Sequence, residues 1–197
     1  MTGHEKPKLP ELVDLSDIHS VIKDIKGGIQ VCMDGKYGGS LLKLIYSGID
    51  TMAYLTIPIG TTSKRVGRLQ KVHFKQWVDK YLRFLHPRCK SEYIWEARNG
   101  LLHTHGAESV AVLQGKVPRI YYYARNYPPT KQAMSDGEHL IFLSLPTLIR
   151  EFFKGIDQYV IDLYSDEEKR VVAEKRCGTM LQVYDDFDKF EREGTIL

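Results

Sequence analysis

The sequence predicts a mainly α-helical fold that carries a small antiparallel β-sheet as an insert at about residues 108–145. Apolar residues recur at three- and four-residue spacing over most of the chain, and short runs of β-branched and aromatic residues are confined to the insert. With 197 residues, 43% hydrophobic and 27% charged, the chain has the composition of one globular domain. We expect a flexible tail at residues 1–12 and a single domain at 13–197, with 107–145 as its β-rich insert.

Two apolar helices are predicted in the first part of this domain. The first covers about residues 14–30, where aliphatic side chains share one helical face and Ser16 or Asp14 serves as the N-cap. The second covers about residues 40–55 and is apolar on most sides, which is typical of the central helix of a bundle. Pro58 follows and ends it.

Two further helices follow a loop at residues 59–68, which is rich in Gly, Thr, Ser and Lys. One covers about residues 69–85, with apolar residues on one side and basic residues on the other. The next covers about residues 91–106, with Ser91 as its N-cap and Gly106 as its C-cap.

The apolar pattern then changes from helical to strand-like spacing. Residues 110–113, 120–123 and 140–145 are short runs of β-branched, aromatic and aliphatic residues, which predict two or three antiparallel strands. Helical spacing returns at about residues 146–164 and 166–184.

Charge is distributed unevenly along the chain. The formal net charge is +3, but residues 64–90 contain nine Lys and Arg against Asp79 alone, which leaves the rest of the chain acidic. A basic segment attracts polyanions, of which nucleic-acid phosphate backbones are the commonest in the cytosol. The alternative is a solvated helix face whose charges are unbalanced. The candidate RNA-binding residues are Lys64, Arg65, Arg68, Lys71 and Lys75.

The helix at 91–106 carries the most informative polar residues. On a helical wheel Glu92, Glu96, Asn99 and His103 share a narrow stripe, whereas Arg98 falls among apolar residues. Because a guanidinium keeps its charge, Arg98 needs either a carboxylate from a neighbouring helix or a pocket that receives an anion.

His103 lies in the last predicted turn, where the negative end of the helix dipole favours the imidazolium form. A histidine that titrates near neutrality beside a phosphate-binding arginine suits the transesterification of RNA. The imidazole moves protons for the 2′-hydroxyl or the leaving 5′-oxygen, and the guanidinium stabilises the charge that develops on the phosphate.

The end of this helix resembles the R-x4–6-H motif of the HEPN superfamily, on the residues Arg98-Asn99-Gly-Leu-Leu-His103. In that motif a polar residue, often Asn, Asp or His, follows the arginine. The resemblance covers residues 13–106 and implies a helical bundle that forms a homodimer, with the two motifs meeting in a shared cleft. It implies a metal-independent endoribonuclease of the toxin–antitoxin or defence type, without a cofactor and with RNA and an antitoxin protein as partners.

By the same resemblance, Arg98 and His103 are catalytic and Asn99 supports them. The family often adds a polar or acidic residue from an earlier helix, and Asp50 is the candidate for that position. Asp50 is equally a candidate for the carboxylate that neutralises Arg98.

Other interpretations of the chain remain open at this point. A non-catalytic domain of the same fold would bind RNA, a nucleotide or a protein. A metal-dependent hydrolase would use His103, His105, His139 and Asp136, although their spacing is not typical of a metal site. Cys89 lies among cations that would lower its pKa, and His73 and His86 are expected on the solvated basic face.

Cysteine content and hydropathy predict the compartment. The chain has three cysteines, Cys32, Cys89 and Cys177, and no CxxC pair, which is typical of a reduced, cytoplasmic protein. No apolar run approaches the length of about 18 residues that a membrane span needs, so we expect no membrane partner.

Overall fold

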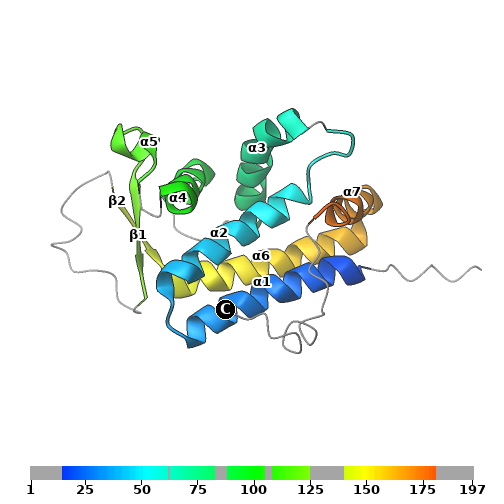
Figure 1. Cartoon of the computed structure of the whole chain (residues 1–197), viewed down its shortest axis with the longest axis horizontal. Coiled ribbons are helices and arrows are strands. Elements are labelled where there is room, and N and C mark those ends of the chain that lie inside the picture. The colour runs from blue at the N-terminus through cyan, green and yellow to red at the C-terminus, as the bar shows by residue number, and fades with distance from the viewer. Residues whose placement is uncertain (1–14, 62, 83–87, 105–107, 125–139, 181–197) are drawn as a thin grey trace, which may run out of the picture.

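The computed structural model describes residues 15–61, 63–82, 88–104, 108–124 and 140–180, and it leaves out the side chains of 63–68 and 103–104. This part of the chain is mainly helical, as predicted, with seven helices and two strands (Figure 1). In chain order they are α1 (Ser16–Asp34), α2 (Gly38–Tyr54), α3 (Ser63–Tyr81), α4 (Ser91–Thr104), α5 (Val110–Leu113), β1 (Arg119–Tyr123), β2 (Leu140–Ser144), α6 (Leu145–Ser165) and α7 (Glu167–Cys177).

Helix α2 occupies the centre of the bundle and packs against α1, α3, α4 and α6. It is buried on more than one face, which explains why its sequence is apolar on most sides. The buried side chains of α2 are Leu41, Ile45, Tyr46, Ile49, Met52 and Ala53. They join one hydrophobic cluster with residues of α1, α3, α4, α6, α7 and both strands.

Four helices, α1, α3, α4 and α6, lie around α2. Helices α1 and α6 run alongside each other in opposite directions, and α3 and α4 cover the other side of α2 (Figure 1). A hydrogen bond of 2.6 Å from Lys26 Nζ to Asp157 Oδ1 links α1 to α6. Helix α7 packs against α1 and α6 at the end of the molecule opposite the strands.

The two strands are parallel, and the predicted antiparallel sheet is therefore wrong. Arg119 pairs with Leu140 and Tyr123 with Ser144, so β1 and β2 run in the same direction. Parallel neighbours need a connection of about a dozen residues or more, because the chain must return to the end where the first strand began. The segment at 124–139 is long enough for that return, and its length was the signal against a hairpin.

Several predicted ends differ from the structure. Residues 110–113 form the single helical turn α5, capped by Ser109, and not a strand. Helix α3 begins at Ser63, within the predicted loop, because the Lys and Arg residues of that turn are good helix formers. Helix α7 ends at Cys177, before the predicted end at 184.

The helix caps are partly as predicted. Leu15 is the N-cap residue of α1 and makes no side-chain cap, Ser16 is the first helical residue, and Asp14 lies outside the described residues. Ser91 is the first residue of α4 and not its cap. At α6, Pro146 lies in the first turn and the Ser144 hydroxyl accepts a hydrogen bond from the Thr147 backbone N–H. The predicted tail at 1–12 and the predicted C-cap Gly106 lie outside the described residues.

No helix in the described ranges is both long enough and apolar enough to cross a membrane.

Close packing of α2 makes Gly48 sensitive to substitution. A Cβ atom at this position would lie 2.7 Å from Cζ of Phe152 on α6 and 3.0 Å from Cγ2 of Ile25 on α1. We therefore predict that Gly48→Ala destabilises the fold by about 1–3 kcal/mol in urea unfolding, because α2 must move away from both neighbours.

The matched control is Gly27→Ala in α1, where a Cβ atom would meet nothing within 4 Å. This substitution should stabilise the helix by about 0.5–1 kcal/mol. Equal effects of the two substitutions would show that contact around α2 does not determine the result.

Candidate functional site

An ion pair between α2 and α4 forms the centre of the candidate site. Asp50 Oδ2 on α2 accepts a hydrogen bond of 2.8 Å from Nε of Arg98 on α4, and it forms an ion pair with Arg98 Nη2 at 2.7 Å. The two side chains are 13% and 15% exposed, so the pair is largely withdrawn from solvent. A carboxylate from a neighbouring helix thus pairs with Arg98, which is one of the two arrangements that the sequence left open.

Asn99, on the polar face of α4, also contacts the guanidinium of Arg98. Its Oδ1 atom accepts a hydrogen bond of 3.1 Å from Arg98 Nη1. The position of His103, one turn after Asn99 in the last turn of α4, lies on the same face of the helix. The His103 side chain lies outside the described part of the chain. The contacts of Arg98 with Asp50 and Asn99 therefore define the site.

Trp95 belongs to the same site, although it was not among the predicted site residues. The Arg98 guanidinium lies 5.0 Å from the centre of the Trp95 ring, a distance typical of a cation–π contact. The ring also contacts Phe74 of α3 edge-on, with centroids 5.1 Å apart. The three-residue spacing of Trp95 and Arg98 on one helix was the signal that would have predicted this contact.

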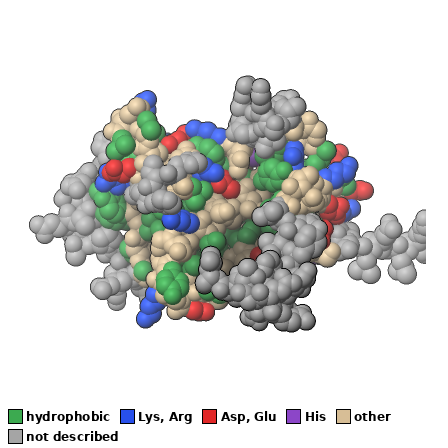
Figure 2. Space-filling model, in the orientation of Figure 1, with side chains coloured by type: hydrophobic (Ala, Val, Ile, Leu, Met, Phe, Trp, Pro, Cys, Tyr) green, Lys and Arg blue, Asp and Glu red, His purple; other side chains and the backbone are tan. Residues whose placement is uncertain are grey.

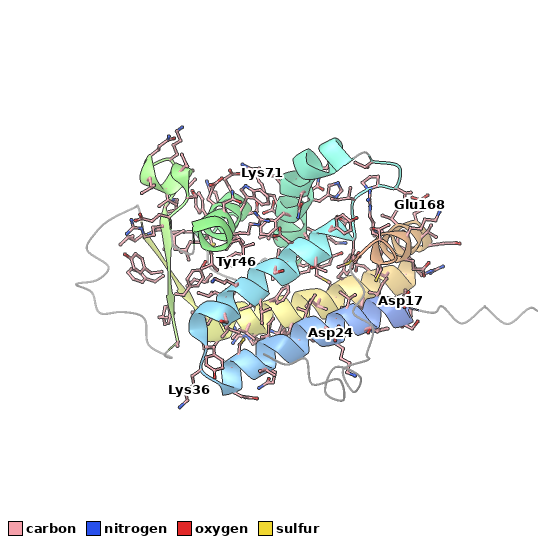
Figure 3. All side chains as sticks on the ribbon, in the orientation of Figure 1. Asp17, Asp24, Lys36, Tyr46, Lys71 and Glu168 are labelled. Atoms are coloured by element: carbon pink, nitrogen blue, oxygen red, sulfur yellow. The ribbon has the colours of Figure 1, made fainter. Side chains whose placement is uncertain are left out.

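Two of the predicted RNA-binding lysines are already paired with acidic residues of α4. Glu92 accepts hydrogen bonds from Lys71 Nζ at 2.9 Å and from Lys75 Nζ at 2.6 Å. Lys71 also lies 3.8 Å from the buried Glu96, and Figure 3 places it between α3 and α4. These lysines therefore fasten α3 to α4, and they do not stand on a face that is uniformly basic.

The charges of this network hold Glu92 as a carboxylate. Hydrogen bonds from Lys75 and then Lys71 lower the pKa of Glu92 below its ordinary value. On the visible face of the molecule, basic and acidic side chains are intermingled (Figure 2). Attraction of a polyanion would have to come from basic residues beyond this network, and the side chains of Lys64, Arg65 and Arg68 lie outside the described part of the chain.

The weaker candidates from the sequence take other roles. Burial raises the pKa of the Cys89 thiol to about 12, which opposes the lowering expected from nearby cations. His73 is half-buried and hydrogen-bonded to Thr56, so it does not lie on a solvated basic face. Within the described ranges no group of three His, Cys, Asp or Glu residues is placed to hold a metal ion. His86, His105, Asp136 and His139 lie outside those ranges.

The geometry gives the site a defined chemical capacity. A guanidinium that is oriented by a carboxylate, an amide and an aromatic ring is fixed in position before any ligand binds. It keeps its charge at any physiological pH and donates hydrogen bonds in a planar array that suits phosphate oxygens.

The Asp50–Arg98 ion pair should contribute measurably to stability, because removal of either partner would leave the other as a poorly solvated charge with no counter-charge. We predict that Asp50→Asn or Arg98→Met alone lowers the free energy of unfolding by about 2 kcal/mol. The double variant should lose less than the sum of the two single losses, and a double-mutant cycle from urea unfolding measures that coupling.

A matched control is the more exposed pair of Lys26 and Asp157, whose side chains are 29% and 65% exposed. Asp157→Asn should change the free energy of unfolding by no more than about 0.5 kcal/mol. If Asp50→Asn has an equally small effect, the pair is not the organising contact of this site.

Comparisons with known proteins identify no relative of the chain. No protein-family model, no curated protein and no solved structure matches the chain.

Proposed function

We propose that the protein is a metal-independent endoribonuclease of the HEPN type, which cleaves RNA by attack of the 2′-hydroxyl on the adjacent phosphodiester. It would act in the cytoplasm as a homodimer, as a toxin or defence protein, and an antitoxin protein would be a further partner. In this proposal Arg98 and His103 are catalytic, and Asn99 and Asp50 position Arg98.

One observation supports the proposal above the others: Asp50 and Asn99 hold the guanidinium of Arg98 from two helices. The resemblance of α4 to the R-x4–6-H motif leads us to expect a supporting polar residue after the arginine and an acidic residue from an earlier helix. Asn99 directly follows Arg98, Asp50 comes from the earlier helix α2, and both contact Arg98, which supports the proposal.

The proposed reaction uses this chain's residues in separate roles. His103 accepts the proton of the 2′-hydroxyl, whose oxygen forms a bond to phosphorus as the bond from phosphorus to the 5′-oxygen breaks. The leaving 5′-oxygen takes up a proton from the imidazolium of His103 or of its counterpart in the second subunit. Arg98 stabilises the extra negative charge on the phosphate oxygens in the transition state. The products are a 2′,3′-cyclic phosphate and a free 5′-hydroxyl.

We predict that the purified protein cleaves single-stranded RNA in the presence of EDTA and leaves a 2′,3′-cyclic phosphate end. His103→Ala should lower the cleavage rate at least about 100-fold, because removal of a general acid–base group typically costs two to four orders of magnitude. Product analysis by gel electrophoresis and mass spectrometry measures both outcomes.

The control is His19→Ala in α1, a histidine that is hydrogen-bonded to Tyr164 and distant from α4 in the chain. This variant should cleave RNA as the wild type does. Cleavage that disappears with EDTA would favour a metal-dependent hydrolase, and a protein that stays monomeric at micromolar concentration would contradict a cleft shared between subunits.

The alternative is a non-catalytic domain of the same fold that binds RNA, a nucleotide or a protein. The pairing of Arg98 with Asp50 is the observation that favours it, because a guanidinium neutralised inside the protein also has a purely structural explanation. A wild-type protein that shifts RNA on a gel but does not cleave it would support this alternative.

Both the ribonuclease and an RNA-binding form of the alternative predict a difference between the two groups of candidate RNA-binding residues. Joint replacement of Lys64, Arg65 and Arg68 by Gln should make the slope of log affinity against log salt shallower by about 2, since each phosphate contact to a single strand contributes about 0.7. Joint replacement of Lys71 and Lys75 should have a smaller effect per residue, because Glu92 and Glu96 together already balance their charges. Filter binding to single-stranded RNA over a salt series measures both slopes, and equal effects per residue would contradict the prediction.

A further inference from the structure

A cavity of about 390 Å³ lies on the side of α3 that faces away from α4. Its walls come from the end of α2, from α3 and from α6 and α7, and its volume is in the range of pockets that hold small organic ligands. Glu168, which Figure 3 labels on α7, stands at this end of the molecule. The Arg98 site is on the opposite face of α3, so the cavity is a separate feature.

The inner walls of the cavity are apolar and largely aromatic. Leu55, Trp77 and Tyr159 line it and are almost completely buried, and Tyr81 and Val172 complete the apolar surface. The ring centroids of Trp77 and Tyr81 are 5.1 Å apart. Such walls favour a flat apolar molecule, because they offer contact area without the loss of hydrogen bonds to water.

The α2 and α7 sides of the cavity are fastened together by Arg176. Its Nε atom donates a hydrogen bond of 2.8 Å to the backbone oxygen of Ile57, its guanidinium also contacts the backbone oxygen of Pro58, and it lies 5.3 Å from the centre of the Tyr54 ring. The cavity is therefore a built part of the fold, with a buried cation closing the corner between two helices.

His73 contributes a single hydrogen-bond acceptor to the cavity. The Thr56 hydroxyl donates its one proton to the backbone oxygen of Ala53, at 2.7 Å. The same Thr56 oxygen lies 2.7 Å from His73 Nδ1, and with the Thr56 proton directed to Ala53 the tautomer that satisfies both contacts carries its proton on Nδ1. In the neutral ring the other nitrogen, Nε2, then carries a lone pair.

His73 is held in this neutral form. Burial, with the positive charge of Arg176 as a second cause, lowers the pKa of His73 below its ordinary value. The cations at the rim do not make the cavity an anion site, because Lys80 contacts Asp162 and Lys169 contacts Asp166. Glu168 adds a further negative charge to the rim. With Arg176 included, the three cations around the cavity are balanced by three carboxylates, so no excess positive charge favours phosphates or other polyanions.

We propose that this cavity binds a neutral, flat aromatic molecule, held by the aromatic walls and by one N–H or O–H group that donates a hydrogen bond to Nε2 of His73. The proposal is independent of the ribonuclease function. A small ligand would occupy the cavity, and RNA would bind on the opposite side of α3.

A pair of probes that differ only in the donor tests this assignment on the wild-type protein. Indole carries a ring N–H, whereas 1-methylindole has the same rings with the donor blocked. We expect indole to bind the full chain about tenfold more tightly than 1-methylindole in isothermal titration calorimetry, because the blocked compound leaves the lone pair of His73 unsatisfied.

Two variants place the binding in this cavity. His73→Phe removes the acceptor but keeps an aromatic ring, so it should abolish the preference for indole, whereas His19→Phe on α1 should keep it. Val172→Phe fills the space and should abolish binding of both compounds. Circular dichroism and thermal unfolding establish that each variant is folded.

Three results would overturn the proposal, and none of them depends on the nuclease assay. Equal affinity of the wild type for both compounds would refute the hydrogen bond to His73. Failure of indole to bind at millimolar concentration would refute the site. Unchanged binding by a folded Val172→Phe variant would place the ligand elsewhere.

Discussion

The enclosure of α2 by four other helices is the constraint on which the rest of the structure depends. A helix in that position must be apolar around most of its circumference, and it must allow close approach where its neighbours are large. Gly48 allows that approach beside Phe152 of α6. Asp50, two residues later, is a carboxylate on the same enclosed helix, and Arg98 compensates for its burial. The ion pair thus fixes which face of α4 turns toward the centre of the bundle.

Local sequence patterns predicted most of the helices, because each helix buries one continuous apolar stripe that its own residues define. The partner of Arg98 was also predictable, since Asp50 is a carboxylate within an otherwise apolar helix. The residues of the two strands did not predict the direction of β2, because the path of the chain between the strands sets their pairing, and only the length of the connection at 124–139 indicated it. The same limit applied to Lys71 and His73, whose surroundings come from α4 and from the end of α2.

Helix α3 separates two environments of opposite character. Lys71 and Lys75 share one face by their four-residue spacing, and that face meets the acidic residues of α4. His73, Trp77 and Lys80 lie on the other side of the helix and line the cavity against α7. A charged, half-exposed interface and an apolar cavity are therefore only one helix diameter apart. A substitution in one environment does not directly alter the other. The proposed ribonuclease function and the proposed ligand of the cavity can therefore be refuted independently.

The pairing of Arg98 with Asp50 has consequences for any anion that binds there. Asp50 holds the guanidinium in position, which lowers the reorganisation needed when a phosphate arrives, but its charge also opposes that phosphate. With His103 neutral, the four proposed site residues carry no net charge, so the site itself exerts little long-range attraction on RNA. Capture of RNA would then depend on the basic residues before Leu69, and Arg98 would act on a phosphate already delivered to α4. Binding and cleavage are in this arrangement functions of different residues, so loss of one need not abolish the other.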